Sequence, residues 1–261
     1  GSGIEVRELL GADRDAAYFL AANPADVTRL QLYCLTSDGR SRMITNPGLN
    51  HAVKVNPSLS YFFDFESSVN MPTRVALRQM DGSFVRYVEP NLVDHLDYYD
   101  IASPVFQRVP TRDGDQMDSM LILPPDFDES KKYPVLMHVY SGPQAPRVRN
   151  RWGGTSYLWH QLLAQKGYVI WMCDNRSATH HGMDVSYPIY GDLGRRELMD
   201  IEDSLSWLKK KQWVDPGRIG IWGWSYGGYM TSYAMTHSKS FKAGIAGAPV
   251  TDWRNYDSIY T

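Results

Sequence analysis

The sequence is poor in features that would indicate a membrane protein, a nucleic-acid partner or a disulfide framework. Its 261 residues contain no run of eighteen apolar residues, so no segment is predicted to span a membrane. The formal net charge of −2 gives no electrostatic reason to expect nucleic acid as a partner. Cys34 and Cys173 lie in apolar strands of different predicted domains, which favours two buried free thiols. The chain begins Gly-Ser-Gly without a methionine or a signal segment, so we expect a piece excised from a longer protein.

The most informative stretch is 218–233, whose centre reads Gly-Trp-Ser-Tyr-Gly around Ser225. Gly-x-Ser-x-Gly is the spacing of a nucleophile elbow, a tight strand-to-helix turn that projects a serine hydroxyl towards a base. Ile219–Trp222 is predicted to form a short buried strand, and the residues from Gly228 onward a helix. A helix-capping serine is the alternative. The position of the motif between a strand and a helix favours Ser225 as a nucleophile.

Residues 1–88 are strand-rich and repeat at an offset of 43 residues. Tyr18-Phe19 recurs as Tyr61-Phe62, and Asp38-Gly39 recurs as Asp81-Gly82. Asp-Gly between apolar runs predicts hairpin turns, and a period near 43 residues is typical of four-stranded propeller blades. Two such units cannot close a propeller, which typically needs four or more blades. A small sandwich with coincidental spacing is the alternative.

Beyond a junction at residues 89–104 and a hairpin, the pattern changes to alternating strands and helices. Short, nearly continuous apolar runs predict strands at 135–140, 168–173, 219–222 and 243–248. Such runs are typical of strands covered by helices on both faces, so we expect an α/β parallel sheet. Helices are predicted at 157–165 and 197–211.

The second of these helices is amphipathic. Its predicted core face comprises Leu198, Ile201, Leu205 and Leu208. Its acidic residues are expected to form a solvated face rather than a metal site, because no histidine lies among them. They are Glu197, Asp200, Glu202 and Asp203.

Three motifs give the chain a resemblance to a known family. They are Val-Tyr-Ser-Gly-Pro at 139–143, the Gly-Trp-Ser-Tyr-Gly-Gly elbow, and Trp253 followed by the segment 256–261. On these residues the chain resembles the prolyl oligopeptidase (S9) family, and within it the dipeptidyl peptidase IV branch. The resemblance covers the chain from about Pro104 onward by specific motifs and residues 1–95 only by pattern. It implies that residues 1–95 are about two blades at the C-terminal end of a β-propeller. Residues 96–261 would then be an α/β-hydrolase catalytic domain, incomplete at its C-terminus.

The resemblance also implies an activity and its residues. Such enzymes hydrolyse peptides through an acyl-enzyme, here on Ser225, and the branch releases N-terminal X-Pro dipeptides. Elbow geometry makes the backbone N–H of Tyr226 one expected oxyanion donor. The resemblance implies the Tyr140 hydroxyl as the second donor. It also implies an aromatic pocket for the residue before the cleaved bond, formed by Tyr256, Tyr260, Trp253 and Val250.

Partners that this chemistry needs are missing from the sequence. A hydrolase triad follows the chain order serine, acid, histidine, and the only histidine after Ser225 is His237, about three helical turns away. The acids that remain, Asp252 and Asp257, fall in the predicted pocket segment. Residues 1–95 contain no adjacent glutamate pair of the kind that binds the substrate's amino terminus in this branch. The turn 174–178 is less glycine-rich than is common in the family, which we expect to change a loop and leave the chemistry intact. We therefore expect negligible turnover from this chain alone.

Two other functions stay open. An acylaminoacyl peptidase or an esterase could use the same scaffold, because fold and nucleophile are shared by many acyl transfers. A non-catalytic binding fragment is the other alternative, although unpaired sheet edges argue against a stable module of that kind. The expected partner is a peptide substrate, and no metal or organic cofactor is implied. Family habit suggests a homodimer of the full-length protein and a periplasmic or secreted location.

Overall fold

The computed structural model describes residues 5–23 and 25–257, which form two compact units. The first unit comprises Gly1–Tyr99 together with Arg149–Tyr157. The second comprises Asp100–Val148 together with Leu158–Thr261. Each unit has its own sheets and its own apolar core.

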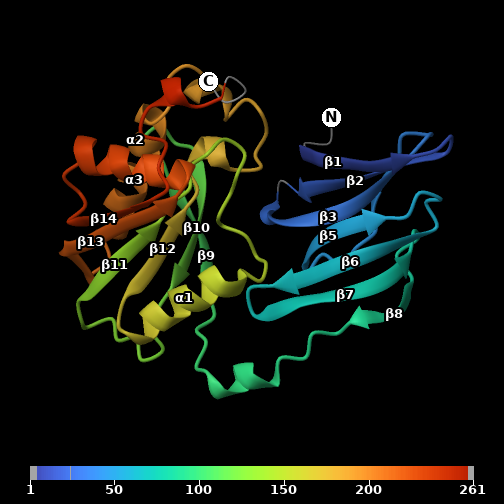
Figure 1. Cartoon of the computed structure of the whole chain (residues 1–261), viewed down its shortest axis with the longest axis horizontal. Helices are drawn as coiled ribbons and strands as arrows, with labels where there is room; N and C mark the ends of the chain where they lie inside the picture. The colour runs from blue at the N-terminus through green and yellow to red at the C-terminus, as the bar shows by residue number, and fades with distance from the viewer. Residues whose placement is uncertain (1–4, 24, 258–261) are drawn as a thin grey trace. The chain divides into compact units, whose positions relative to one another are not determined.

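The first unit contains two four-stranded antiparallel sheets, each built in simple up-and-down order (Figure 1). One sheet comprises β1 (Glu5–Ala12), β2 (Ala16–Asn23), β3 (Asp26–Thr36) and β4 (Ser41–Met43). The other comprises β5 (Asn50–Val55), β6 (Tyr61–Ser68), β7 (Met71–Gln79) and β8 (Phe84–Glu89). The repeat period thus matches one four-stranded sheet per repeat, although the repeat pattern did not reveal β1 and β5.

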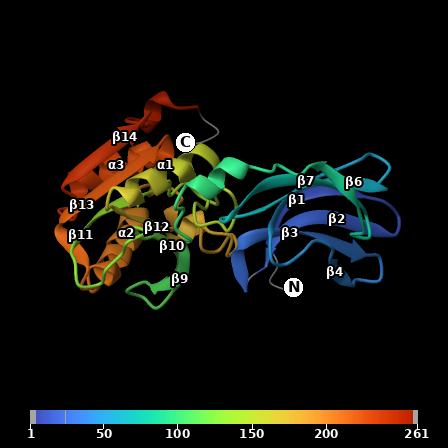
Figure 2. The same cartoon turned by 90° about the horizontal axis from the view of Figure 1, so that it is seen from below.

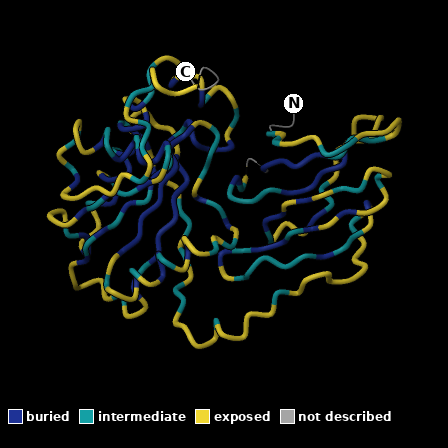
Figure 3. The backbone as a smooth tube through the Cα atoms, viewed as in Figure 1, coloured by how far each residue is buried: buried dark blue, intermediate teal, exposed yellow. Residues whose placement is uncertain are grey.

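The Asp-Gly turns join the last two strands of each sheet, as predicted. Gly39 and Gly82 have φ angles of +85° and +97°, a region that favours glycine. The two sheets share a core that joins Leu20 and Leu32 of one to Val53 and Phe62 of the other. β8 is exposed along its whole length, as the tube in Figure 3 shows.

The second unit is built on one six-stranded sheet of order β14-β13-β11-β12-β10-β9 (Figures 1 and 2). The four strands β14, β13, β11 and β12 are parallel, and β10 and β9 extend the sheet antiparallel. Their bounds are β9 (Val105–Pro110), β10 (Gln116–Ile122), β11 (Tyr133–His138), β12 (Val169–Cys173), β13 (Val214–Trp224) and β14 (Ala243–Gly247). The predicted α/β sheet is confirmed, with a mixed rather than purely parallel order.

Three α-helices and four short 3₁₀ helices complete the described chain. The α-helices are α1 (Gly154–Gln165), α2 (Arg195–Leu208) and α3 (Tyr226–His237). The 3₁₀ helices are η1 (Asp94–Tyr98), η2 (Arg176–Ala178), η3 (Tyr187–Ile189) and η4 (Trp253–Asn255). Among the residues that the structure describes, no helix combines the length and hydropathy needed to cross a bilayer.

The main core of the second unit lies between the sheet and the helices α2 and α3. The predicted core face of α2 is confirmed, because its four apolar side chains are all buried there. They pack with Met137 and Ile221 of the sheet and with Met230 of α3. Cys34 and Cys173 are both buried free thiols, as expected.

The predicted solvated acidic face of α2 is wrong for two of its residues. Glu197 and Asp200 are buried, with exposed fractions of 0% and 3%. Each has a strong polar partner, since Tyr226 donates to Glu197 and Arg176 pairs with Asp200. Burial of these carboxylates is tolerated because hydrogen bonds replace the lost water.

Candidate active site

Ser225 stands at the junction of β13 and α3 in a strained backbone conformation. Its φ and ψ are 59° and −119°, a combination that costs a non-glycine residue of order 1–3 kcal/mol. The Ser225 N–H donates to the carbonyl oxygen of Gly247 at 2.9 Å, and its carbonyl accepts from the N–H of Tyr229 at 3.0 Å. Its side chain makes no capping hydrogen bond to the helix. The hydroxyl is therefore held at a sharp strand-to-helix turn without serving as the helix cap.

The glycines on either side of Ser225 allow the close packing of this turn. A Cβ atom at Gly223 or Gly227 would overlap the carbonyl oxygen of Val139 in the neighbouring strand segment. A Cβ at Gly228 would overlap the carbonyl oxygen of Gly247. The helix begins at Tyr226, two residues earlier than predicted, because these glycines let its first turn rest directly on neighbouring backbone.

Tyr226 combines an N-terminal helix position with a buried side chain. As the first residue of α3, its backbone N–H is among those that have no partner within the helix. Its hydroxyl donates to Oε1 of Glu197 at 2.6 Å. Burial raises the pKa of the Tyr226 phenol, and the nearby Glu197 carboxylate raises it further. Burial also raises the pKa of Glu197, and the Tyr226 hydrogen bond offsets part of that effect.

Tyr140 lies in the turn that follows β11, beside the elbow. Its ring centroid is 6.1 Å from that of Tyr226. The guanidinium carbon of Arg147 lies 4.2 Å from the Tyr140 ring centroid, a cation–π distance. The structure thus places the side chains of Tyr140 and Tyr226 close together, and a Cβ atom at Gly227 would lie 3.1 Å from the Tyr140 Cα, so the Tyr140 backbone lies against the elbow.

Three of the four predicted pocket residues are described. The Trp253 ring lies 5.5 Å from the Tyr226 ring and 5.7 Å from the Tyr256 ring, measured between centroids. The three rings thus form an aromatic series that starts at the residue directly after Ser225. Val250 is half-buried in the loop between β14 and η4. Tyr260 lies outside the described residues.

A groove of about 790 Å³ lies beside this aromatic series. Trp253 forms one wall, the turn residues Pro143 and Gln144 another, and the segment 183–193 the rest. Of the predicted pocket residues that are described, the groove takes in Trp253 alone.

His237, the histidine that follows Ser225 among the described residues, lies far from it along the helix. His237 is at the opposite end of α3, where its ring stacks on Tyr233 at 4.0 Å. Asp252 pairs with Arg254 two residues away.

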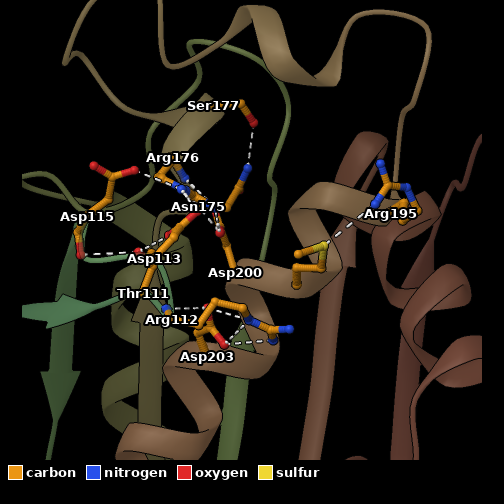
Figure 4. Close-up of polar contacts among 11 residues, drawn as sticks. Thr111, Arg112, Asp113, Asp115, Asn175, Arg176, Ser177, Arg195, Asp200 and Asp203 are labelled. Atoms are coloured by element: carbon orange, nitrogen blue, oxygen red, sulfur yellow. Dashed lines mark hydrogen bonds and ion pairs between the residues drawn. The ribbon is translucent and has the colours of Figure 1, made fainter.

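The loop after β12 is held by a network of charged residues, shown in Figure 4. Arg176 makes two-point contact with the buried Asp200 and also pairs with Asp113 and Asp115 at 2.7 and 2.8 Å. A hydrogen bond from Thr111, and a further one from Arg176, lower the pKa of Asp113 to about 2. The network joins the β9–β10 turn to α2 and to the loop that carries η2.

The first unit contains one group of described residues with metal-ligating atoms close together, namely His51, Asp64 and Glu66. Arg78 pairs with both carboxylates at 2.9 Å. The two ring nitrogens of His51 contact Asp64 and the carbonyl oxygen of Asn46. Arginine thus supplies the positive charge that a metal ion would supply, and the group is an internal ion network.

Sequence reasoning missed three residues around the site, namely Glu197, Asp174 and Arg147. Glu197 supports Tyr226, Asp174 hydrogen-bonds the turn after β11, and Arg147 covers the Tyr140 ring. Glu197 and Asp174 act on residues more than twenty positions away, and the contact of Arg147 with Tyr140 depends on the turn between them, so no local pattern marks the three residues. The departure of the turn 174–178 from the family pattern was the one available signal.

The sequence is similar to a known family of peptidases. Residues 155–261 match the model of the prolyl oligopeptidase family. Dipeptidyl peptidase 8 from Homo sapiens is 30% identical over 271 residues, covering 100% of this chain and 30% of the human protein. "Probable dipeptidyl-aminopeptidase B" from Ajellomyces dermatitidis is 41% identical over 190 residues, covering 69% of this chain and 20% of that protein. The chain therefore spans 20% to 30% of the length of these relatives.

A solved structure is similar to this chain over its whole length. The crystal structure of Porphyromonas gingivalis dipeptidyl peptidase 4 matches with a TM-score of 0.93 and 32% identity, covering 100% of this chain and 37% of that one. The fold is thus that of the last blades of a β-propeller followed by the N-terminal part of an α/β-hydrolase domain, as predicted.

Proposed function

Because the chain belongs to the prolyl oligopeptidase family and resembles its dipeptidyl peptidase IV branch, we propose that it forms part of a serine-type dipeptidyl peptidase with Ser225 as the nucleophile. The Ser225 hydroxyl attacks the substrate's peptide carbonyl, the amine product leaves, and water then hydrolyses the acyl-enzyme. The observation that carries this proposal is the strained elbow at Ser225, followed at once by the N-terminus of α3.

The oxyanion that develops in each step needs hydrogen-bond donors placed beforehand. The Tyr226 backbone N–H and the Tyr140 hydroxyl are the proposed donors, and removing one such donor typically costs 10²- to 10³-fold in kcat. The backbone of Tyr140 lies against the elbow, since a Cβ atom at Gly227 would come within 3.1 Å of the Tyr140 Cα, and this closeness supports the pairing.

We further propose that Trp253, Tyr256, Val250 and Tyr260 bind the residue before the cleaved bond. The Trp253 ring contacts the rings of both Tyr226 and Tyr256. A row of rings of this kind would suit the wall of a pocket for a proline-sized side chain. The substrate class that follows is peptides with proline, or a similar small residue, second from a free amino terminus. The proposed division is 1–95 for the propeller part and 96–261 for the catalytic domain.

We also propose that these 261 residues alone have negligible turnover. Proton transfer from Ser225 needs a base within about 3 Å, and His237 is held at the far end of α3. Kinetic tests therefore use the longest natural form of the protein that contains this sequence, called the full-length protein below.

The proposal is tested with paired chromogenic substrates. The full-length protein is given Gly-Pro-p-nitroanilide and its N-acetylated counterpart, with Ser225→Ala as the inactive control. A dipeptidyl peptidase releases nitroaniline from the free substrate and not from the acetylated one. Preferential release of nitroaniline from the acetylated substrate would show that no free amino terminus is needed, which contradicts a dipeptidyl peptidase. Cleavage of acetyl-Ala-p-nitroanilide would instead indicate an acylaminoacyl peptidase, which removes a single N-acylated residue. Equal cleavage by Ser225→Ala would overturn the assignment of the nucleophile.

A further inference from the structure

We propose that Asp174 is a positioning residue for Tyr140 and that it acts through the turn 141–148, whose Arg147 side chain lies over the Tyr140 ring. The inference rests on the proposed function, in which the Tyr140 hydroxyl donates to the oxyanion. It assigns a role to the segment after β12, which the sequence had suggested to be only an altered loop.

The turn after β11 needs an external support. Ser141 and Gln144 have φ angles of 67° and 54°, in the left-handed region that non-glycine residues rarely adopt. Residues in this region are strained, so the turn keeps this shape only if its surroundings hold it. The Tyr140 side chain emerges from the beginning of this turn.

Asp174 supplies that support. One carboxylate oxygen accepts the N–H of Arg147 at 2.9 Å, and the other accepts the N–H groups of Arg147 and Val148 at 3.0 and 2.8 Å. Burial raises the pKa of Asp174 to about 7, although the hydrogen bonds from Arg147 and Val148 oppose this rise. Above that pH the carboxylate is ionised, and hydrogen bonds to an ionised carboxylate are roughly twice as strong as neutral ones. Asp174 is itself buried directly after β12, and its N–H donates to the carbonyl oxygen of Asp118 in β10 at 3.0 Å. The turn is thus anchored to two strands of the sheet.

A second tether comes from the same segment. The N–H of Gln144 donates to the carbonyl oxygen of Ser177 at 2.8 Å. Residues 174–177 therefore hold the turn near its middle and near its end. Both attachments fix backbone atoms, so they set the direction in which Arg147 leaves the turn.

Arg147 carries this constraint to Tyr140. Its guanidinium carbon lies 4.2 Å from the ring centroid, well within the range of a cation–π contact. The Tyr226 ring is 6.1 Å away. The Tyr140 ring thus has the Arg147 cation over its face and a second aromatic ring nearby. A donor displaced by 1 Å can cost about 10²-fold in rate, so the orientation of this ring matters for catalysis.

The anchoring is tested by amide hydrogen exchange in the full-length protein. Asp174→Asn removes carboxylate charge and replaces one acceptor with an amide donor, so we expect exchange in residues 144–148 to accelerate at least tenfold. Asp126→Asn, the same change at an exposed aspartate of the same unit, is the matched control and should leave these residues unchanged. Unchanged exchange in Asp174→Asn would overturn the anchoring role.

The link to Tyr140 is tested by fluorine NMR with 3-fluorotyrosine incorporated at position 140. We expect the resonance to shift in Arg147→Met and in Asp174→Asn, and to return towards the wild-type position in Arg147→Lys, which retains a cation. Arg151→Met, the same change at an exposed arginine four residues further along the chain, should leave it unchanged. A resonance that is the same in wild type, Arg147→Met and Asp174→Asn would overturn the inference.

Kinetics separate positioning from a purely structural role. With the Gly-Pro substrate we expect Asp174→Asn to lower kcat about tenfold and Arg147→Met about threefold, with KM within twofold of wild type. A loss confined to thermal stability, or to KM, would contradict positioning. If wild type fails to cleave the substrate, the proposed function fails, while the exchange and fluorine measurements still decide whether Asp174 and Arg147 hold Tyr140.

Discussion

The hydroxyl of Tyr226 donates a 2.6 Å hydrogen bond to Oε1 of Glu197, a carboxylate with no exposed surface. The other oxygen of Glu197 accepts the N–H of Gly194 at 2.9 Å. This contact joins the start of α2 to the residue directly after Ser225. The buried carboxylate of Glu197 therefore holds the Tyr226 side chain in place, and the residue that follows Ser225 has little freedom to move.

Tyr226→Phe should destabilise the protein by about 2–3 kcal/mol, because a buried carboxylate oxygen loses its donor. Tyr229→Phe is the matched control, since its hydroxyl donates to a neutral acceptor, the carbonyl oxygen of Leu193. That change should cost about 1 kcal/mol. Urea unfolding of both variants checks the comparison, and equal losses would contradict a special role for the Glu197 contact.

Gly227→Ala should destabilise the protein by about 3 kcal/mol and disrupt the elbow, because its Cβ would overlap the carbonyl oxygen of Val139. Gly220→Ala tests the same change in β13, where the new Cβ would lie 3.5 Å from Cδ1 of Leu136 in ordinary contact. Its effect should stay within about 1 kcal/mol. Thermal unfolding of the two variants measures the difference, and a Gly227→Ala protein as stable as wild type would refute the packing argument.

His160 should make stability depend on pH. It lies in α1 against His138 and Trp222, and burial lowers its pKa to about 4. Because the folded pKa lies below the unfolded value of about 6.5, the unfolded state binds the proton first as pH falls. The contribution of neutral His160 to the free energy of unfolding is therefore complete above pH 6.5 and is lost as the pH falls towards 4.

We therefore expect wild type to lose about 2–3 kcal/mol more stability than His160→Leu between pH 7.5 and 4.5. Urea unfolding of both proteins at the two pH values gives this difference directly. Parallel losses in the two proteins would show that His160 does not titrate in this window.

Arg176→Met should cost about 3 kcal/mol, because the buried Asp200 loses a two-point partner (Figure 4). Arg112→Met removes the neighbouring contact to Asp203, in which the arginine side chain is 53% exposed. That variant should lose less than about 1 kcal/mol, as is typical of exposed pairs. Comparison of the two unfolding midpoints shows which variant loses more stability. A larger loss in Arg112→Met than in Arg176→Met would contradict the prediction.

The apolar runs of the sequence were sufficient to predict the strands of the α/β sheet. Val169–Cys173 is buried at every position, so hydrophobicity alone marks it. The start of α3 was predicted two residues late, because glycine weakens helices in general and the tight contact of Gly227 with Val139 is a tertiary feature.

The burial of two acidic residues of α2 could not be predicted from the local sequence pattern. Four acids near a helix start are normally solvated, yet Glu197 and Asp200 are buried by partners, Tyr226 and Arg176, more than twenty residues away in sequence. Asp174 is similar, because its role depends on the turn it reaches across the sheet. Residues of this kind are recognised only when the fold brings their partners together.

The central claim is that Ser225 is an activated nucleophile, and it is tested most directly by labelling the full-length protein with a fluorophosphonate. Peptide mass spectrometry then locates the adduct. We predict a single adduct on Ser225, its loss in Ser225→Ala, and its retention in Ser232→Ala, where the altered hydroxyl only bonds the carbonyl oxygen of Gly228 in α3. Failure of the full-length protein to label, or labelling that persists in Ser225→Ala, would contradict the claim.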